Sequence, residues 1–167
     1  MRVFLWRDLI DTWHFSQLLA LWAGRKIAAP IQPRFVMSNA VIQVPAAPAH
    51  AAIEHFKAEF TFETDCWDTH EALEQGNPGF VLVDARSPEM FAKGHIAGAV
   101  NIPHGKIIGS RMTDYPDSTL FVTYCAGPHC NGAARAALKL ARLGFPVKIM
   151  SGGVTGWLDE GFDLQAN

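Results

Sequence analysis

Three short, largely apolar runs constrain the fold of this chain more than any other feature of its sequence. The runs are Phe80–Val83, Leu120–Tyr124 and Val147–Met150. Runs of this length between turn-forming residues are typical of strands that are buried on both faces. Helical patterns separate them, and Gly132–Leu143 carries its apolar residues on one face. Strands that alternate with helices predict an α/β domain with a mainly parallel sheet.

The other predicted elements are shorter. They are a helix and a brief strand over Ile53–Phe62, a helix over 69–74 capped by Asp68, a helix from Ser87 to about Gly94, a strand over Ala99–Pro103 and a helix around Trp157. Residues 40–52 are rich in Ala and Pro and carry no acidic or basic residue except His50, so they predict a linker or an irregular lead-in.

Length and composition indicate one folded domain with a full hydrophobic core. The chain has 167 residues, of which 49% are hydrophobic and 18% are charged, and a domain has roughly 150 residues. A net charge of -2 and a pI near 6.4 argue against a nucleic-acid-binding protein, which is normally basic. The sequence has no apolar stretch of about 18 residues, so we expect no membrane-spanning helix. Three cysteines predict no disulfide framework, and we therefore expect reduced cysteines and a cytoplasmic protein.

The first 36 residues differ from the rest of the chain. They carry five basic and two acidic residues, whereas the remainder carries nine basic and fourteen acidic ones. Charged residues interrupt the apolar run that a secretory signal requires. Apolar residues recur there at helical spacing, and Pro30 and Pro33 would end such a helix. Three interpretations stay open: an additional helix, an amphipathic helix on a membrane surface, or translation that starts at Met37.

These observations divide the chain into three predicted parts. Residues 1–36 are an N-terminal extension that is helical or a mis-assigned start. Residues 37–59 are a lead-in or linker, and residues 60–167 are the folded domain.

The stretch with the most chemical information is LFVTYCAGPHCNGAAR, residues 120–135. A predicted buried strand ends at Cys125, a loop of small and turn-forming residues follows, and a helix opens around Asn131 and Gly132. Ligands bind beyond the carboxyl ends of the strands in open α/β sheets, and a loop before a helix directs N–H groups toward its centre. A cysteine at this place is expected to be a nucleophilic thiolate. The alternative is a buried structural cysteine.

Four motifs follow one another along the same part of the chain. They are VDARSPEMF at 83–91, GHIAGAVNIP at 94–103, Tyr124-Cys125, and GGVTGW at 152–157. Over about residues 60–164 the chain therefore resembles the rhodanese-like domains, which are single-domain sulfurtransferases. The resemblance implies a three-layer α/β/α fold with a five-stranded parallel sheet. It also implies that Cys125 is the catalytic cysteine and that no metal or organic cofactor is needed.

One loop residue, Cys130, departs from the family pattern. Family members commonly place an arginine five residues after the cysteine, where it helps to hold an anionic sulfur donor, and here that residue is Cys130. Donor binding would then depend on loop N–H groups, with help from His129. The absence of the arginine favours a persulfide donor over thiosulfate. Related phosphatases have an arginine where this chain has Asn131, so we expect no phosphatase activity. Cys130 is either a second sulfur that forms a disulfide with Cys125 or a small residue that shapes the loop.

The predicted site combines this loop with two supporting residues. The predicted substrate-binding loop consists of Ala126, Gly127, Pro128, His129, Cys130 and Asn131. Asp84 and Arg86 are expected either to brace the loop by hydrogen bonds or to form a plain structural ion pair. The histidines lack the spacing of a metal site, so we predict none; they are His95, His104 and His129.

The predicted function is sulfur transfer. Cys125 would take a sulfane sulfur from thiosulfate or another persulfide donor and pass it to a thiol or cyanide acceptor. The expected partners are a small sulfur-donor anion or persulfide and a thiol acceptor, which includes protein thiols. We expect no nucleic-acid and no membrane partner. The alternative is a non-catalytic rhodanese-like module that binds a partner or senses oxidation through Cys125 and Cys130.

Overall fold

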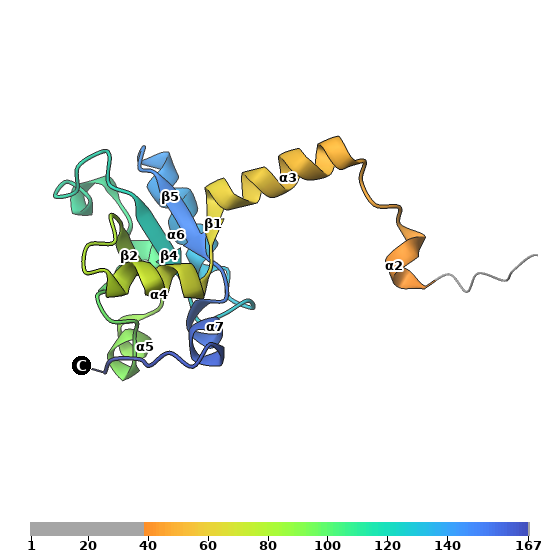
Figure 1. Cartoon of the computed structure of the whole chain (residues 1–167). Coiled ribbons are helices and arrows are strands. Elements are labelled where there is room, and N and C mark those ends of the chain that lie inside the picture. Colours follow the sequence, from red (N-terminus) through yellow and green to blue (C-terminus); the bar gives the residue numbers. More distant parts are fainter. Residues whose placement is uncertain (1–38, 167) are drawn as a thin grey trace, which may run out of the picture. The chain divides into compact units, whose positions relative to one another are not determined.

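The computed structural model of the chain describes residues 39–166 (Figure 1). Residues 39–46, which contain the short helix α2 (Ala40–Gln43), and residues 47–166 form separate units, and each is described by itself. The predicted N-terminal helix within residues 1–36 and the alternative start at Met37 lie outside the described residues. The division of the chain at residues 36 and 59 therefore stays a prediction.

One five-stranded parallel sheet forms the centre of the larger unit. Its strands are β1 (Glu63–Thr64), β2 (Val81–Asp84), β3 (Val100–Asn101), β4 (Phe121–Tyr124) and β5 (Val147–Met150). The strand order is β1-β5-β4-β2-β3, and each pairing is parallel. The register aligns Val122 of β4 with Leu82 on one side and with Lys148 on the other. The predicted five-stranded parallel sheet is confirmed.

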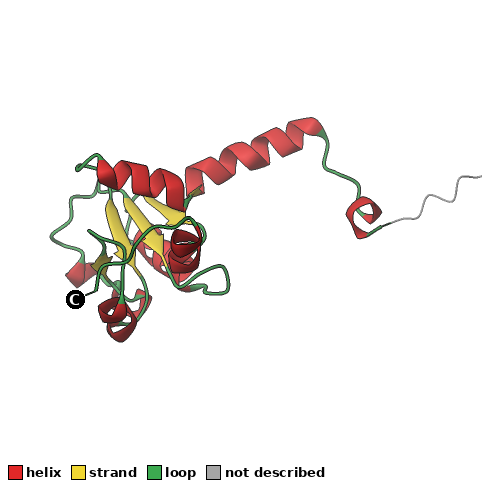
Figure 2. Ribbon diagram, turned by 60° about the horizontal axis from the view of Figure 1, so that its bottom comes forward, coloured by secondary structure: helices red, strands yellow, loops and turns green. Residues whose placement is uncertain are grey.

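Helices cover both faces of this sheet (Figure 2). The helices of this unit are α3 (Ala49–Phe62), α4 (Cys66–Glu74), α5 (Pro88–Lys93), α6 (Gly132–Arg142) and α7 (Gly153–Asp159), with the 3-10 turns η1 (His104–Lys106) and η2 (Gly109–Arg111). Helix α3 extends away from the sheet and has no buried residue. Successive strand residues point to opposite faces, and the neighbours Leu82 and Val83 accordingly belong to different core clusters. The first cluster includes Cys66 of α4 and Trp157 of α7, and the second includes Leu140 of α6. The predicted three-layer arrangement is confirmed.

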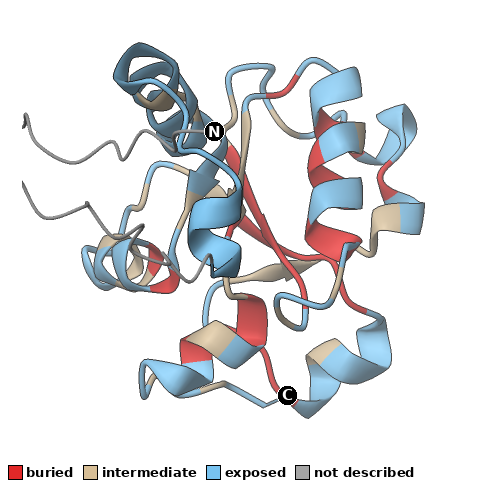
Figure 3. Cartoon of the chain, turned by 90° about the vertical axis from the view of Figure 1, so that its right-hand side faces the viewer, coloured by how far each residue is buried: buried red, intermediate tan, exposed pale blue. Residues whose placement is uncertain are grey.

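Burial explains why the strands are continuous apolar runs. The central strands are buried, whereas the outer faces of the helices are exposed (Figure 3). All four residues of β4 are buried, because helices lie on both sides of it. Burial of a large apolar side chain such as Phe121 contributes about 1.5–3 kcal/mol to folding. Strand β4 is therefore held firmly where it ends.

Several element boundaries differ from the sequence prediction. The brief strand predicted within Ile53–Phe62 forms after that range, as β1, because α3 continues to Phe62. Helix α4 begins at Cys66, because the side chain of Asp65 accepts a hydrogen bond from the Asp68 N–H at 2.8 Å and caps the helix. The predicted cap at Asp68 is therefore wrong by three residues. The strand predicted over Ala99–Pro103 shortens to β3, a two-residue strand at the edge of the sheet.

The stretch predicted to be a linker contains helical structure. The Ala/Pro-rich pattern of residues 40–52 predicts an irregular lead-in, but α2 and the first turn of α3 form there. The Asn39 side chain accepts hydrogen bonds from the N–H groups of Val41 and Ile42 and starts α2. Pro48 precedes α3 at its N-cap, where a missing N–H costs nothing, and alanines favour helix after it.

Helix α3 joins the sheet at its C-terminal end. It leads directly into β1, and the Lys148 ammonium of β5 donates a hydrogen bond to the Phe60 carbonyl at 2.8 Å. None of the residues of α3 is buried. Among the described helices, none combines the length and the apolar character that crossing a bilayer requires.

Candidate active site

The carboxyl end of β4 positions the candidate catalytic cysteine. Cys125 directly follows β4 and is 5% exposed. The Tyr124 carbonyl accepts a hydrogen bond from the Ala85 N–H at 2.9 Å. The Tyr124 hydroxyl accepts a second hydrogen bond from the Ile96 N–H at 3.2 Å. Burial raises the pKa of Tyr124, so this anchor stays neutral. Cys125 therefore lies at the edge of the sheet where parallel α/β proteins bind ligands.

The loop after Cys125 is held by the start of α7. The Val154 N–H donates to the Cys125 carbonyl at 3.0 Å, and the Thr155 N–H donates to the Ala126 carbonyl at 2.9 Å. Only glycine fits at position 153, because its φ is 60° and a Cβ there would overlap the Cys125 carbonyl oxygen. The turn between β5 and α7 is thus built to touch the cysteine loop.

Cys125 and Cys130 form a disulfide within this loop. The Cys130 N–H donates to the Gly127 carbonyl at 2.9 Å, and this turn folds the loop back on itself. A Cβ at position 132 would lie 2.7 Å from the Cys125 sulfur and 3.3 Å from the Cys130 sulfur, so Gly132 leaves room for both. The expectation of reduced cysteines does not hold for this pair, because the turn brings the two sulfur atoms together.

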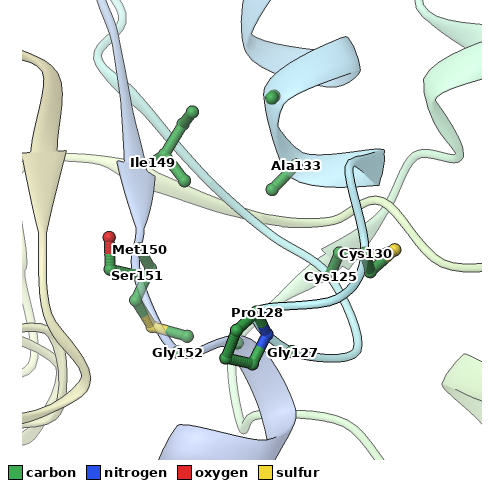
Figure 4. Close-up of a pocket in the computed structure, with 11 residues that line it drawn as sticks. Cys125, Gly127, Pro128, Cys130, Ala133, Ile149, Met150, Ser151 and Gly152 are labelled. Carbon is green, nitrogen blue, oxygen red and sulfur yellow. A yellow bond between two sulfur atoms is a disulfide. The ribbon is translucent and has the colours of Figure 1, made fainter. Parts of the chain in front are cut away.

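A cavity of about 230 Å³ lies between the loop, β5 and the first turn of α6 (Figure 4). Its lining residues are Cys125, Gly127, Pro128, Cys130, Ala133, Ala134, Ile149, Met150, Ser151, Gly152 and Gly153. Three of the predicted loop residues, Gly127, Pro128 and Cys130, line the cavity, whereas Ala126, His129 and Asn131 do not. The side chains of Ala126, His129 and Asn131 are exposed.

The loop keeps several N–H groups available. Within residues 39–166, four loop N–H groups donate to no protein atom: those of Ala126, Gly127, His129 and Asn131. The eleven-residue helix α6 begins directly after them, and its N-terminus adds positive potential. Unpaired N–H groups before a helix favour an anion. The loop can therefore stabilise negative charge without an arginine.

Asp84 and Arg86 form a buried ion pair at the end of β2. The Arg86 Nε donates to both carboxylate oxygens of Asp84 at 3.0 Å, and Nη2 donates to the Gly94 carbonyl at 2.7 Å. Burial lowers the pKa of Arg86, but the hydrogen bond and the charge of Asp84 outweigh burial and leave that pKa raised. Their hydrogen bonds run to Gly94 and the strand ends rather than to loop residues 126–131.

A family model for the rhodanese-like domain matches residues 68–160. The chain belongs to the rhodanese-like domain family. The match extends from β2 to α7. It therefore includes the cysteine loop, β5 and the start of α6, which together line the cavity.

Curated relatives of this rhodanese-like domain have names that describe different functions. The chloroplastic thiosulfate sulfurtransferase 16 of Arabidopsis thaliana is 32% identical over 98 residues, which cover 53% of this chain and 82% of the relative. The thiosulfate sulfurtransferase GlpE of Pseudomonas entomophila is 35% identical and covers 52% and 78%. The HTH-type transcriptional regulator Rv0324 of Mycobacterium tuberculosis is 35% identical and covers 54% and 43%. The match covers 59% of the Escherichia coli protein YibN. This chain therefore spans only about half the length of Rv0324 and YibN.

Solved structures support the same family. The crystal structure of the BH2092 protein from Bacillus halodurans is 34% identical with a TM-score of 0.69 and covers 71% of this chain and 87% of that one. The solution structure of a rhodanese-like domain from Anabaena is 25% identical with a TM-score of 0.57 and covers 63% and 79%.

The sequence did not predict the part of the cavity lining that comes from the end of β5. Met150, the last residue of β5, and Ser151, which follows it, line the cavity, and the Thr155 hydroxyl donates to the Ala126 carbonyl at 2.9 Å. The signal was present in the Gly152-Gly153 turn after a buried strand. This turn alone does not indicate a contact with the cysteine loop, because only the strand order shows that β5 lies beside β4.

Candidate metal ligands do not gather at the site. Within residues 39–166, no group of three or more His, Cys, Asp or Glu side chains is arranged to hold a metal ion. His95 lies elsewhere: its Nδ1 is 3.0 Å from the Phe91 carbonyl, and its ring stacks on the Phe91 ring.

Proposed function

We propose that this rhodanese-like chain is a sulfurtransferase that carries sulfane sulfur as a persulfide on Cys125. The observation that supports this most is the position of Cys125: it lies at the carboxyl end of a central strand and lines a cavity beside a loop with unpaired N–H groups. Two similar proteins of the same family are thiosulfate sulfurtransferases.

The proposed reaction begins when the Cys125 disulfide has been reduced. The Cys125 thiolate attacks the outer sulfur of the donor, and the donor's S–S bond breaks. With thiosulfate, the electron pair leaves with sulfite, and Cys125 keeps the transferred sulfur as a persulfide. An acceptor thiol or cyanide then attacks this outer sulfur, and the electron pair of the broken bond restores the Cys125 thiolate. Loop N–H groups and the N-terminus of α6 stabilise the negative persulfide.

The cavity favours a small donor. Its volume of about 230 Å³ is below the roughly 300–1,000 Å³ of pockets for larger organic ligands. Because Cys130 stands where family members commonly have an arginine that helps to hold an anionic donor, N–H groups must supply the binding energy. This arrangement suits a low-molecular-weight or protein persulfide at least as well as thiosulfate. The acceptor would be a thiol, and thiol acceptors are abundant in a reducing compartment such as the cytoplasm.

The intact mass of the protein after sulfur loading tests this proposal. The reduced Cys130→Ser variant is mixed with thiosulfate, and in parallel with a low-molecular-weight persulfide. We expect a gain of one sulfur atom per chain, which the Cys125→Ser/Cys130→Ser double variant does not show. If neither donor adds sulfur to the Cys130→Ser variant, the sulfurtransferase proposal is wrong.

The second candidate function is a non-catalytic module that senses oxidation. The Cys125–Cys130 disulfide favours it, because the disulfide ties up the nucleophile. The regulator Rv0324 belongs among the similar proteins, but this chain spans 43% of it. Sulfur loading separates the two functions, since a pure sensor forms the disulfide yet accepts no sulfur.

A further inference from the structure

We propose that Cys130 is a second catalytic residue, which converts the Cys125 persulfide into a disulfide and releases the outer sulfur as hydrosulfide. This inference rests on the proposed persulfide and adds the fate of its sulfur. The protein would then release the outer sulfur as hydrosulfide and depend on an external dithiol to reduce the disulfide. This activity is additional to sulfur transfer to an external acceptor.

The loop places Cys130 within bonding reach of Cys125. The two Cα atoms are 6.1 Å apart, within the range of about 4.4–6.8 Å that a disulfide spans without backbone movement. The hydrogen bond from the Cys130 N–H to the Gly127 carbonyl, at 2.9 Å, holds the turn that brings Cys130 back. The Cys130 sulfur can therefore reach the Cys125 sulfur while the strand and the helix on either side stay in place.

The start of α6 provides both space and polarity for the second sulfur. Gly132 has no side chain, and a Cβ there would lie 2.7 Å from the Cys125 sulfur. The Gly132 N–H itself donates to the Cys130 sulfur at 3.4 Å. A hydrogen bond from the first N–H of a helix stabilises a thiolate over a thiol. The contact seen here is to a disulfide sulfur, and once the disulfide is reduced the same N–H would stabilise the Cys130 thiolate.

The third cysteine shows the contrast. Cys66 is buried, and its thiol lies 3.3 Å from the Ser151 carbonyl, to which it donates. Burial, followed by the charges of Asp65 and Glu160, raises the pKa of Cys66 to about 11. Cys66 therefore stays protonated and serves as a matched control.

The proposed steps balance in atoms and electrons. The Cys130 thiolate attacks the inner sulfur of the Cys125 persulfide, a bond forms between the two cysteine sulfurs, and the outer S–S bond breaks. Its electron pair leaves with the outer sulfur, which departs as hydrosulfide. An external dithiol then reduces the disulfide: it becomes a disulfide itself and returns both cysteines to the thiol state. With thiosulfate, the net products are sulfite, hydrosulfide and the oxidised dithiol.

Exposure indicates where the dithiol attacks. Cys130 is half-buried, whereas Cys125 is 5% exposed. Thiol–disulfide exchange requires access to the attacked sulfur. The dithiol therefore reacts at Cys130 and expels the Cys125 thiolate, which is the group that accepts the next sulfur.

A single turnover without external thiol tests the inference. Reduced full-length protein is freed of reductant and mixed with thiosulfate, and in parallel with a low-molecular-weight persulfide. Sulfite, hydrosulfide and the intact mass are then measured. We expect the wild type to release hydrosulfide in an amount equal to the sulfur taken up and to end as the Cys125–Cys130 disulfide. Cys130→Ser and Cys130→Ala should keep the sulfur as a persulfide and release no hydrosulfide, and Cys66→Ser should behave as the wild type does.

The outcomes distinguish this inference from the proposed function. If the wild type retains its persulfide as fully as Cys130→Ser does, the role of Cys130 is refuted while Cys125 remains a sulfur carrier. If Cys130→Ser and Cys130→Ala take up no sulfur from either donor although both variants are folded by circular dichroism, the sulfurtransferase proposal fails, and the inference fails with it.

Discussion

The buried ion pair at the end of β2 makes the strongest prediction about stability. Asp84 is 0% exposed, and the side chain of Arg86 is 6% exposed. Arg86→Met removes the guanidinium but keeps most of the apolar stem, so the change mainly removes the charge and its hydrogen bonds. The Asp84 carboxylate then remains buried without its cation, and the Gly94 carbonyl loses its donor.

The expected loss follows from this burial. Removal of one partner from a buried ion pair costs about 3–5 kcal/mol, because the other charge stays desolvated. A domain of this size has a total stability of about 5–15 kcal/mol. Arg86→Met should therefore remove a large share of the free energy of unfolding. The double variant Asp84→Asn/Arg86→Met leaves no buried charge and should lose only about 1–3 kcal/mol.

Urea unfolding followed by circular dichroism measures both variants. The free energy in water comes from linear extrapolation of the transition. The reasoning requires that the double variant is more stable than Arg86→Met. It is refuted if Arg86→Met loses about 0–1 kcal/mol, the range of exposed ion pairs, or if adding Asp84→Asn lowers stability further.

Three further predictions concern positions around the site. Gly132→Ala should slow disulfide formation after mild oxidation, because its Cβ would lie 2.7 Å from the Cys125 sulfur. Gly153→Ala should destabilise the fold by about 2–4 kcal/mol in urea unfolding, since it adds a clash with a carbonyl oxygen to a positive φ. Stability should fall as the pH rises from about 9 to about 11, because the unfolded chain ionises Cys66 at its ordinary pKa of 9.0 while the folded chain keeps that proton up to a pKa of about 11.

Matched variants control each of these predictions. Gly105→Ala has no neighbour within 4 Å of its Cβ and should leave oxidation unchanged. Gly161→Ala shares a positive φ of 83° but meets no atom within 4 Å, so a loss equal to that of Gly153→Ala would contradict the clash. Cys66→Ser keeps a donor for the Ser151 carbonyl but does not titrate, and an unchanged alkaline slope in this variant would contradict the assignment.

The central strands could be predicted because burial leaves a local signal in the sequence. Residues 121–124 are a run of buried residues because helices cover both faces of the sheet at β4, whereas in β5 only Met150 is fully buried. The two-residue strands β1 and β3 leave a weaker signal, because two residues cannot show a period. The cap at Asp65 was missed because Asp68, three residues later, is also an aspartate, and aspartate is a preferred N-cap residue at either position.

The site could be predicted in part. A cysteine that ends a buried strand before a small-residue loop identified Cys125, and the motif order identified the rhodanese-like family. The lining from Met150 and Ser151 could not be found, because it depends on β5 pairing with β4 rather than on either strand's own residues. The direction of the Arg86 hydrogen bonds toward Gly94 likewise depends on a neighbouring segment.

By itself, the sequence determined the α/β fold class, the family and the candidate nucleophile Cys125, because periodicity, turn residues and motif spacing are properties of short segments. Only the tertiary structure decided that Cys130 meets Cys125 and that the turn after β5 lines the same cavity as these two cysteines. The physical reason is that both results depend on distances between sulfur atoms and between strand ends. Backbone hydrogen bonds of the folded loop set the first distance, and the strand order sets the second.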